Sequence, residues 1–171
     1  EWHERVEAHG DRLLLAREAD DFLRAKDSGR TAVLMNFQDT TMLEGKLENI
    51  DALHALGMRS FQLTYNFRNR VGDGCLERTN AGLSDFGVEV VERANEIGVM
   101  IDLSHCGRQT TLDGITFSAR PVAITPTMCD AVRPGHPRSK TDEQIRRCAE
   151  KGGVVGMIAL GYFVGPDPGG E

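Results

Sequence analysis

Residues 99–105 read VMIDLSH, an apolar run that ends in polar residues and leads directly into a segment with helical spacing. The run predicts a β-strand, in which successive side chains alternate between faces. We therefore expect Ile101, Leu103 and His105 on one face, and Asp102 and Ser104 on the other. A histidine at the carboxyl end of a strand, just before a helix, lies where parallel α/β folds place their chemistry. A single histidine is more often structural than a ligand, because catalytic zinc sites use three protein ligands.

Four further runs resemble this one, since they are nearly continuous, apolar and rich in β-branched residues, as strands buried on both faces are. They span 31–37, 60–65, 121–125 and 153–160. Helical spacing is found in 2–27 with a break at Gly10, in 44–56, in 84–97 with Ser84 as N-cap, in 108–118, and in 142–151 with Thr141 as N-cap. Gly57, Gly98 and Gly152-Gly153 then mark turns that favour a positive φ.

The alternation of strands and helices predicts an α/β fold with a parallel sheet, either doubly wound or a (β/α)8 barrel. No glycine-rich nucleotide-binding loop follows any of the runs, which disfavours the nucleotide-binding version. Five strands are too few for a closed barrel of about 250 residues. We therefore expect residues 1–171 to form a single incomplete barrel domain of a protein that is longer at both ends, with 165–171 in a loop. Unpaired strand edges in such a piece favour association, so a homo-oligomer is expected.

Composition excludes several classes of protein. The 171 residues are 40% hydrophobic and 27% charged with a net charge of -6, values typical of a soluble globular protein. The absence of a basic stripe argues against nucleic-acid binding, and no apolar run approaches the roughly 20 residues that span a membrane. The four cysteines show no C-x-x-C spacing, so free thiols and a cytoplasmic location are expected; they are Cys75, Cys106, Cys129 and Cys148. A Cys106–His105 dyad is disfavoured, because neighbouring strand residues point to opposite faces.

Five motifs follow one another in a specific order: LTYN (63–66), GLSDFG (82–87), IDLSH (101–105), HPRSK (136–140) and EKGGVV (150–155). In this combination the chain resembles the membrane (renal) dipeptidase family of zinc metallopeptidases. The resemblance implies a partial (β/α)8 TIM barrel of about five consecutive βα units. It also implies two zinc ions, held by a His-x-Asp pair, a bridging Glu and two further histidines, and hydrolysis of dipeptides by metal-activated water.

The resemblance assigns roles to three residues present here. His105 matches a zinc-ligand position. Arg138 matches the arginine that anchors the substrate carboxylate, with a solvated loop arginine as the alternative. Tyr65 stands where the family has a histidine near the substrate carbonyl. A phenol can still donate a hydrogen bond to an oxyanion, and the alternative role is an aromatic filler at the barrel mouth.

Other positions depart from the family pattern. Gln38 takes the place of the bridging Glu, and the neighbouring Asp39 could replace it only if the strand is bulged or already turning. Pro126 takes the place of the second zinc-binding histidine, and Thr125 and Thr127 beside it are poor zinc ligands. The His-x-Asp pair that the resemblance implies is expected on a strand before residue 1. The remaining histidines are predicted to be surface residues: His3, His9, His54 and His136.

Three functions follow from this pattern. The first is a metal-dependent dipeptidase-like hydrolase that acts on a dipeptide or related small amide with zinc as cofactor. The second is a catalytically inactive binding or structural protein that has lost the dinuclear zinc site. The third keeps one metal for the hydrolysis of another amide or ester. For residues 1–171 alone we expect no stoichiometric zinc and no dipeptide hydrolysis, because a bridging charge and a ligand are both replaced.

Overall fold

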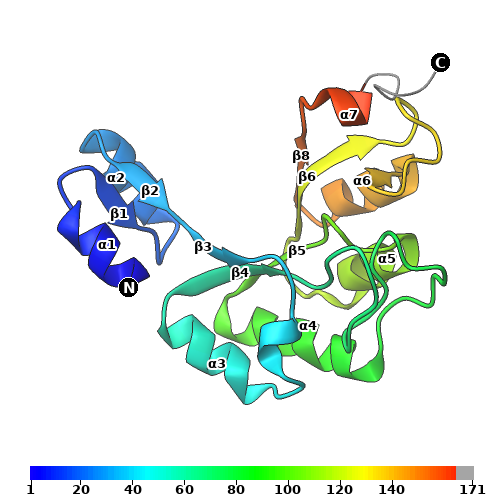
Figure 1. The fold of residues 1–171 in the computed structure, drawn as a ribbon, viewed down its shortest axis with the longest axis horizontal. Coiled ribbons are helices and arrows are strands. Elements are labelled where there is room, and N and C mark those ends of the chain that lie inside the picture. Colours follow the sequence, from blue (N-terminus) through cyan, green and yellow to red (C-terminus); the bar gives the residue numbers. More distant parts are fainter. Residues whose placement is uncertain (165–171) are drawn as a thin grey trace.

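The computed structural model describes residues 1–164, in which helices and strands alternate along the chain (Figure 1). The predicted loop 165–171 lies outside the described residues. The elements are α1 (Trp2–Ala8), β1 (Leu13–Leu15), α2 (Asp20–Asp27), β2 (Thr31–Val33), β3 (Met35–Phe37), the 3-10 turn η1 (Thr41–Leu43), α3 (Glu48–Ala55), β4 (Met58–Gln62), α4 (Asp85–Ile97), β5 (Met100–Asp102), α5 (Arg108–Phe117), β6 (Ala123–Cys129), β7 (Ser139–Lys140), α6 (Asp142–Glu150), β8 (Val154–Met157) and α7 (Gly161–Val164).

The main sheet is parallel throughout. Its strand order is β3-β4-β5-β6, and both β7 and β8 pair with β6. Neighbouring strands in this order are joined by α3, α4 and α5, as right-handed βαβ units require. The predicted α/β fold with a parallel sheet is therefore confirmed.

Capping residues begin and end the helices as predicted. The Ser84 hydroxyl accepts a hydrogen bond from the Gly87 amide at the start of α4, and Gly98 ends that helix with a φ of 81°. Thr141 begins α6 in a reciprocal capping box with Gln144. These short-range interactions satisfy backbone groups that a helix end leaves without partners, so they are visible in the sequence.

Several predicted boundaries are wrong. Residues Leu13–Leu15 form strand β1 where the sequence predicts helix, and β1 pairs with β2 in a separate two-stranded sheet. The predicted strand 31–37 is divided at Leu34, so that β2 joins the small sheet and β3 joins the main one. Strand β6 continues to Cys129, beyond the predicted end at residue 125. In each case the pairing partner, which is distant in the chain, sets the boundary.

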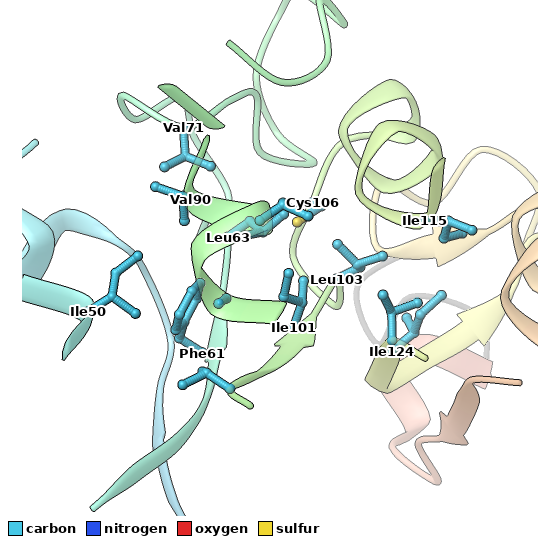
Figure 2. Packing of buried hydrophobic residues seen from close by; sticks show 14 of the residues in the cluster. Ile50, Phe61, Leu63, Val71, Val90, Ile101, Leu103, Cys106, Ile115 and Ile124 are labelled. Atoms are coloured by element: carbon cyan, nitrogen blue, oxygen red, sulfur yellow. The ribbon is translucent and has the colours of Figure 1, made fainter. Parts of the chain in front are cut away.

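The hydrophobic core lies between the main sheet and its covering helices (Figure 2). Phe61 on β4, Ile101 on β5 and Ile124 on β6 point the same way and are almost completely buried. Each such side chain contributes about 1.5–3 kcal/mol by leaving water. The opposite face of the same strands carries polar side chains, among them Gln62 and Asp102, which are paired in register. Polar groups therefore face the interior side of the partial barrel.

Candidate functional site

The candidate site lies where β4, β5 and β6 end, and we call this region the mouth. Strand β5 ends at Asp102, and the chain then turns before α5 begins. The prediction that His105 shares a strand face with Ile101 and Leu103 is wrong for this reason. Ile101 and Leu103 are buried in the core, whereas His105 lies in the turn and is half-buried.

Two consecutive residues, Tyr65 and Asn66, contact the His105 side chain. The imidazole ring stacks on the ring of Tyr65, with the ring centroids 4.0 Å apart and an angle of 22° between the planes. Its Nδ1 atom lies 2.8 Å from Oδ1 of Asn66. Burial, followed by the nearby cations of Arg138 and Lys140, lowers the pKa of His105 to about 4. The imidazole is therefore neutral at pH 7, which is the form that binds a metal or accepts a hydrogen bond.

Asp102 organises the interior side of the mouth. Its Oδ1 accepts hydrogen bonds from the Ser104 amide at 2.8 Å, from the Ser104 hydroxyl and from the Thr125 amide at 3.3 Å. Its Oδ2 accepts one from the Thr125 hydroxyl at 2.9 Å. This buried carboxylate joins the end of β5 to β6. Sequence reasoning assigned no role to Asp102, although the alternation of the motif IDLSH already places Asp102 and Ser104 on one face.

Arg138 is buried against the same turn, with 8% of its surface exposed, so the solvated-loop alternative is wrong. Its guanidinium donates to the carbonyl oxygen of Ser104 and, at 3.1 Å, to that of Pro126. It also lies 5.7 Å from the ring centre of Phe163. Arg138 therefore braces the ends of β5 and β6 beside His105, and a guanidinium has five N–H donors, which leaves some for a ligand.

Lys140 is a second buried cation that the sequence did not single out. Only 1% of its surface is exposed, and its Nζ donates to the Cys106 carbonyl and the Thr111 hydroxyl, both at 2.8 Å. Burial lowers the pKa of Lys140 to about 8. Nothing in the local sequence distinguishes this lysine from an exposed one, because its burial comes from the pairing of β7 with β6.

Gln38, which departs from the family pattern, and its neighbour Asp39 also lie at the mouth. Gln38 is exposed after β3, and it lines a hollow of about 320 Å³ together with Tyr65. Asp39 does not project beside it as a free carboxylate. Its Oδ1 accepts hydrogen bonds from the Thr40 amide and the Asn69 side chain, both at 2.5 Å, and thereby holds the loop after β3.

The residues around Pro126 offer no replacement ligand. The Thr125 hydroxyl donates to Asp102, and the Thr127 hydroxyl donates to the Arg138 carbonyl at 2.8 Å. His136, predicted to lie on the surface, is 8% exposed, and its Nδ1 accepts from the Arg138 amide. His9 is exposed as predicted, whereas His3 and His54 are half-buried.

The donor groups at the mouth do not fit a dinuclear zinc site. Within residues 1–164, no three His, Cys, Asp or Glu side chains lie close enough together to hold a metal ion. Of the three matched ligand positions, only His105 carries an imidazole that can bind zinc, since the others carry a neutral amide and a proline without a side-chain donor atom. A neutral amide binds zinc weakly and cannot offset the charge of two cations.

A long loop, residues 66–83, covers one side of the mouth. The buried carboxylate of Asp73 accepts hydrogen bonds from Arg68 Nε at 2.6 Å, from the Thr79 hydroxyl at 2.9 Å and from the Ala81 amide at 2.8 Å. The Arg68 guanidinium holds the pKa of Asp73 below its usual range. The loop is thus organised around an ion pair and is bridged to the turn after β5 at Gly74 and Cys106.

The surroundings of Cys106 are those of a structural cysteine rather than a reactive one. All four cysteines are free, and the Cys106 side chain is buried in the core (Figure 2). Burial raises the pKa of the Cys106 thiol, which disfavours the nucleophilic thiolate. No helix among the described residues is long and apolar enough to cross a membrane.

Known proteins resemble this chain over nearly all of its length. It is 28% identical over 165 residues to dipeptidase tcpJ of Claviceps purpurea (strain 20.1), a match that covers 95% of this chain and 39% of that protein. It is 30% identical over 154 residues to dipeptidase verJ of Clonostachys rogersoniana, covering 89% of this chain and 39% of that protein. The chain therefore spans about two fifths of the length of these curated relatives.

Solved structures agree in fold. An amidohydrolase from Pseudomonas aeruginosa superposes with a TM-score of 0.89 and 34% identity, covering 95% of this chain and 49% of that one. A metallopeptidase from Rhodobacter sphaeroides, solved with a phosphinate mimic of the dipeptide L-Ala-D-Ala, superposes with a TM-score of 0.88 and 26% identity, covering 96% and 48%. The partial-barrel prediction is confirmed by these neighbours. A family model described as membrane dipeptidase (peptidase family M19) matches residues 1–169, and the chain therefore belongs to this family.

Proposed function

We propose that this chain forms the mouth of a dipeptidase-family barrel that binds a dipeptide or related small amide but lacks the second zinc site. The observation that carries the proposal is the set of groups around His105. Gln38 and Pro126 replace two expected metal ligands, and Tyr65 stacks on the one imidazole that remains. Family membership supports the substrate class, and the missing donors favour binding over hydrolysis by residues 1–171.

The charges at the mouth suit a dipeptide. The buried cations Arg138 and Lys140 favour a ligand carboxylate, because opposite charges attract each other more strongly in surroundings of low polarity than in water. Tyr65, which is 41% exposed, offers a hydroxyl beside the hollow next to β3. The neutral imidazole of His105 can accept a hydrogen bond from an N–H group of the ligand. Together these groups can bind both the carboxylate and the N–H groups of a small zwitterion such as a dipeptide.

The proposal extends to the organisation of the protein. We propose one incomplete barrel domain within a longer polypeptide, and a homo-oligomer for residues 1–171, since β3, β7 and β8 each pair with only one strand of the described main sheet. The free thiols support a cytoplasmic location. Zinc is the metal that the family position of His105 favours.

Calorimetric titration and elemental analysis test the proposed function. Residues 1–171 are expected to bind Ala-Ala, to bind its C-terminal amide at least about tenfold more weakly because a charged partner of Arg138 is lost, and to leave both peptides intact. Zinc is expected well below one ion per chain after dialysis. Two zinc ions per chain with cleavage of Ala-Ala would contradict the proposal, as would equal affinities for the two peptides.

A second candidate is a metal-dependent dipeptidase, which the family membership and the neutral imidazole of His105 favour. Restoring both ligands with Gln38→Glu and Pro126→His is expected to tighten zinc binding by more than tenfold, because even indirect partners of a metal change its affinity by about 10–100-fold. The matched control, Asn36→Glu with Pro126→Ala, adds the same charge two residues earlier, on β3, and places no histidine at residue 126. Equal zinc affinities of the two double variants would argue against this candidate.

A further inference from the structure

Asn66 contacts His105 in a way that the proposed function does not use. Its Oδ1 lies 2.8 Å from the imidazole Nδ1 and 3.6 Å from Sγ of Cys75. Asn66 has a φ of 65°, a left-handed conformation that asparagine adopts more readily than most residues. The side chain is therefore directed at the imidazole by an unusual backbone conformation.

A short part of the long loop fixes both partners. The Leu76 amide donates to the Asn66 carbonyl at 2.6 Å, and the Cys75 amide donates to the His105 carbonyl at 2.9 Å. Gly74, just before them, approaches so closely that a Cβ there would overlap the Asn66 carbonyl group. Because three consecutive residues clamp Asn66 and His105, the two side chains have little freedom to move apart.

We infer that Asn66 is a positioning residue that holds His105 in the tautomer with the proton on Nδ1 and directs Nε2 toward the mouth. Oδ1 of Asn66 can only accept, so the imidazole Nδ1 beside it is the donor, and the Cys75 thiol is a second donor to the same oxygen. The stacked Tyr65 ring covers one face of the imidazole and opposes its rotation.

The role of Asn66 rests on the proposed function, because it makes Nε2 of His105 the atom that contacts the ligand. With the proton on Nδ1, Nε2 has a free lone pair and accepts a hydrogen bond. The ligand group that it fits is an N–H donor, such as the ammonium or amide group of a dipeptide, rather than a second acceptor.

Nitrogen NMR of histidine-labelled residues 1–171 without ligand tests the inference. At neutral pH, His105 is expected to show a protonated, pyrrole-type Nδ1 and an unprotonated, pyridine-type Nε2; the signals are assigned by their loss in His105→Gln. Asn66→Gly removes the acceptor and accommodates the positive φ. It is expected to shift the tautomer ratio by about fivefold toward Nε2–H, the change that one neutral hydrogen bond of about 1 kcal/mol supports.

Two further variants separate positioning from a general loss of structure. Asn66→Asp keeps an oxygen acceptor and is expected to retain the Nδ1–H tautomer. Glu44→Gly is the matched control, because Glu44 also has a positive φ, of 52°, in a different loop, and it is expected to leave the His105 signals unchanged. Thermal unfolding establishes that each variant is folded before its spectrum is compared.

The inference is overturned if the wild-type chain carries the proton on Nε2 or on both nitrogens, or if folded Asn66→Gly keeps the wild-type tautomer. Because the measurement needs no ligand, it is independent of the dipeptide titration. Failure of Ala-Ala to bind, with the tautomer shift present, would reject the proposed function and leave the role of Asn66 intact.

Discussion

Asp102→Ala is expected to lower the free energy of unfolding by about 4 kcal/mol. The substitution removes a buried carboxylate that accepts four hydrogen bonds and joins β5 to β6. Hydrogen bonds to charged groups are worth about 1.5–3 kcal/mol each, and the amides of Ser104 and Thr125 would lose their partner in a buried place. Urea unfolding of wild type and variant under identical conditions measures the difference.

The Asp102→Asn variant is the matched control, because it keeps the size of the side chain and one oxygen acceptor. We expect a loss of about 1–2 kcal/mol, since the Thr125 hydroxyl can turn and accept from the new amide. Equal losses for the two variants would show that the charge dominates. A loss below about 1 kcal/mol for Asp102→Ala would show that water replaces the carboxylate, and the proposed link between β5 and β6 would be wrong.

The parts of the fold that could be predicted are those that depend on interactions between residues close together in the sequence. The caps at Ser84 and Thr141 bond within three residues, so the sequence places the starts of α4 and α6 correctly. Strand β1 was missed because three residues cannot show a period. Its strand conformation comes from pairing with β2, which lies 18 residues further along the chain in the register Leu14↔Ala32 and its neighbours.

The residues of the candidate site likewise divide into those that local sequence patterns identify and those that they do not. The motifs LTYN and IDLSH identify Tyr65 and His105, and the structure brings their rings together. The burial of Lys140 and His136 could not be predicted, because it arises from the pairing of β7 with β6 and from packing against Phe163. The role of Asn66 depends on the loop at Gly74, which no local pattern connects to His105.

Lys140→Met is expected to change the pH dependence of stability by about 3 kcal/mol between pH 8 and 10.5. Lys140 has a pKa of about 8 in the folded chain and 10.5 as the ordinary value. Between these values the unfolded chain binds more protons, so the lysine makes the free energy of unfolding rise with pH across this window. Below pH 8 the cost of burying the charge is fully present, and above pH 10.5 it is absent. The difference between these two pKa values corresponds to about 3 kcal/mol.

Three thiols oppose this trend. Burial raises the pKa of Cys75, Cys106 and Cys148, so the unfolded chain loses those protons first and the thiols lower stability as pH rises past about 9. The wild-type curve alone therefore mixes two effects of opposite sign. The difference between wild type and Lys140→Met removes most of the thiol effect, because the variant keeps all three thiols and the Lys140 cation lowers the pKa of Cys75 and Cys106 by less than burial raises it.

Urea unfolding from pH 7 to 10.5 under reducing conditions measures that difference, with Lys46→Met as the control for an exposed lysine. The advantage of wild type over Lys140→Met is expected to grow by about 3 kcal/mol between pH 8 and 10.5, whereas the Lys46→Met difference stays constant. A constant difference for Lys140 would mean that its ammonium group reaches water. The positive charge at the mouth would then be screened by solvent, and Arg138 alone would remain to attract a ligand carboxylate.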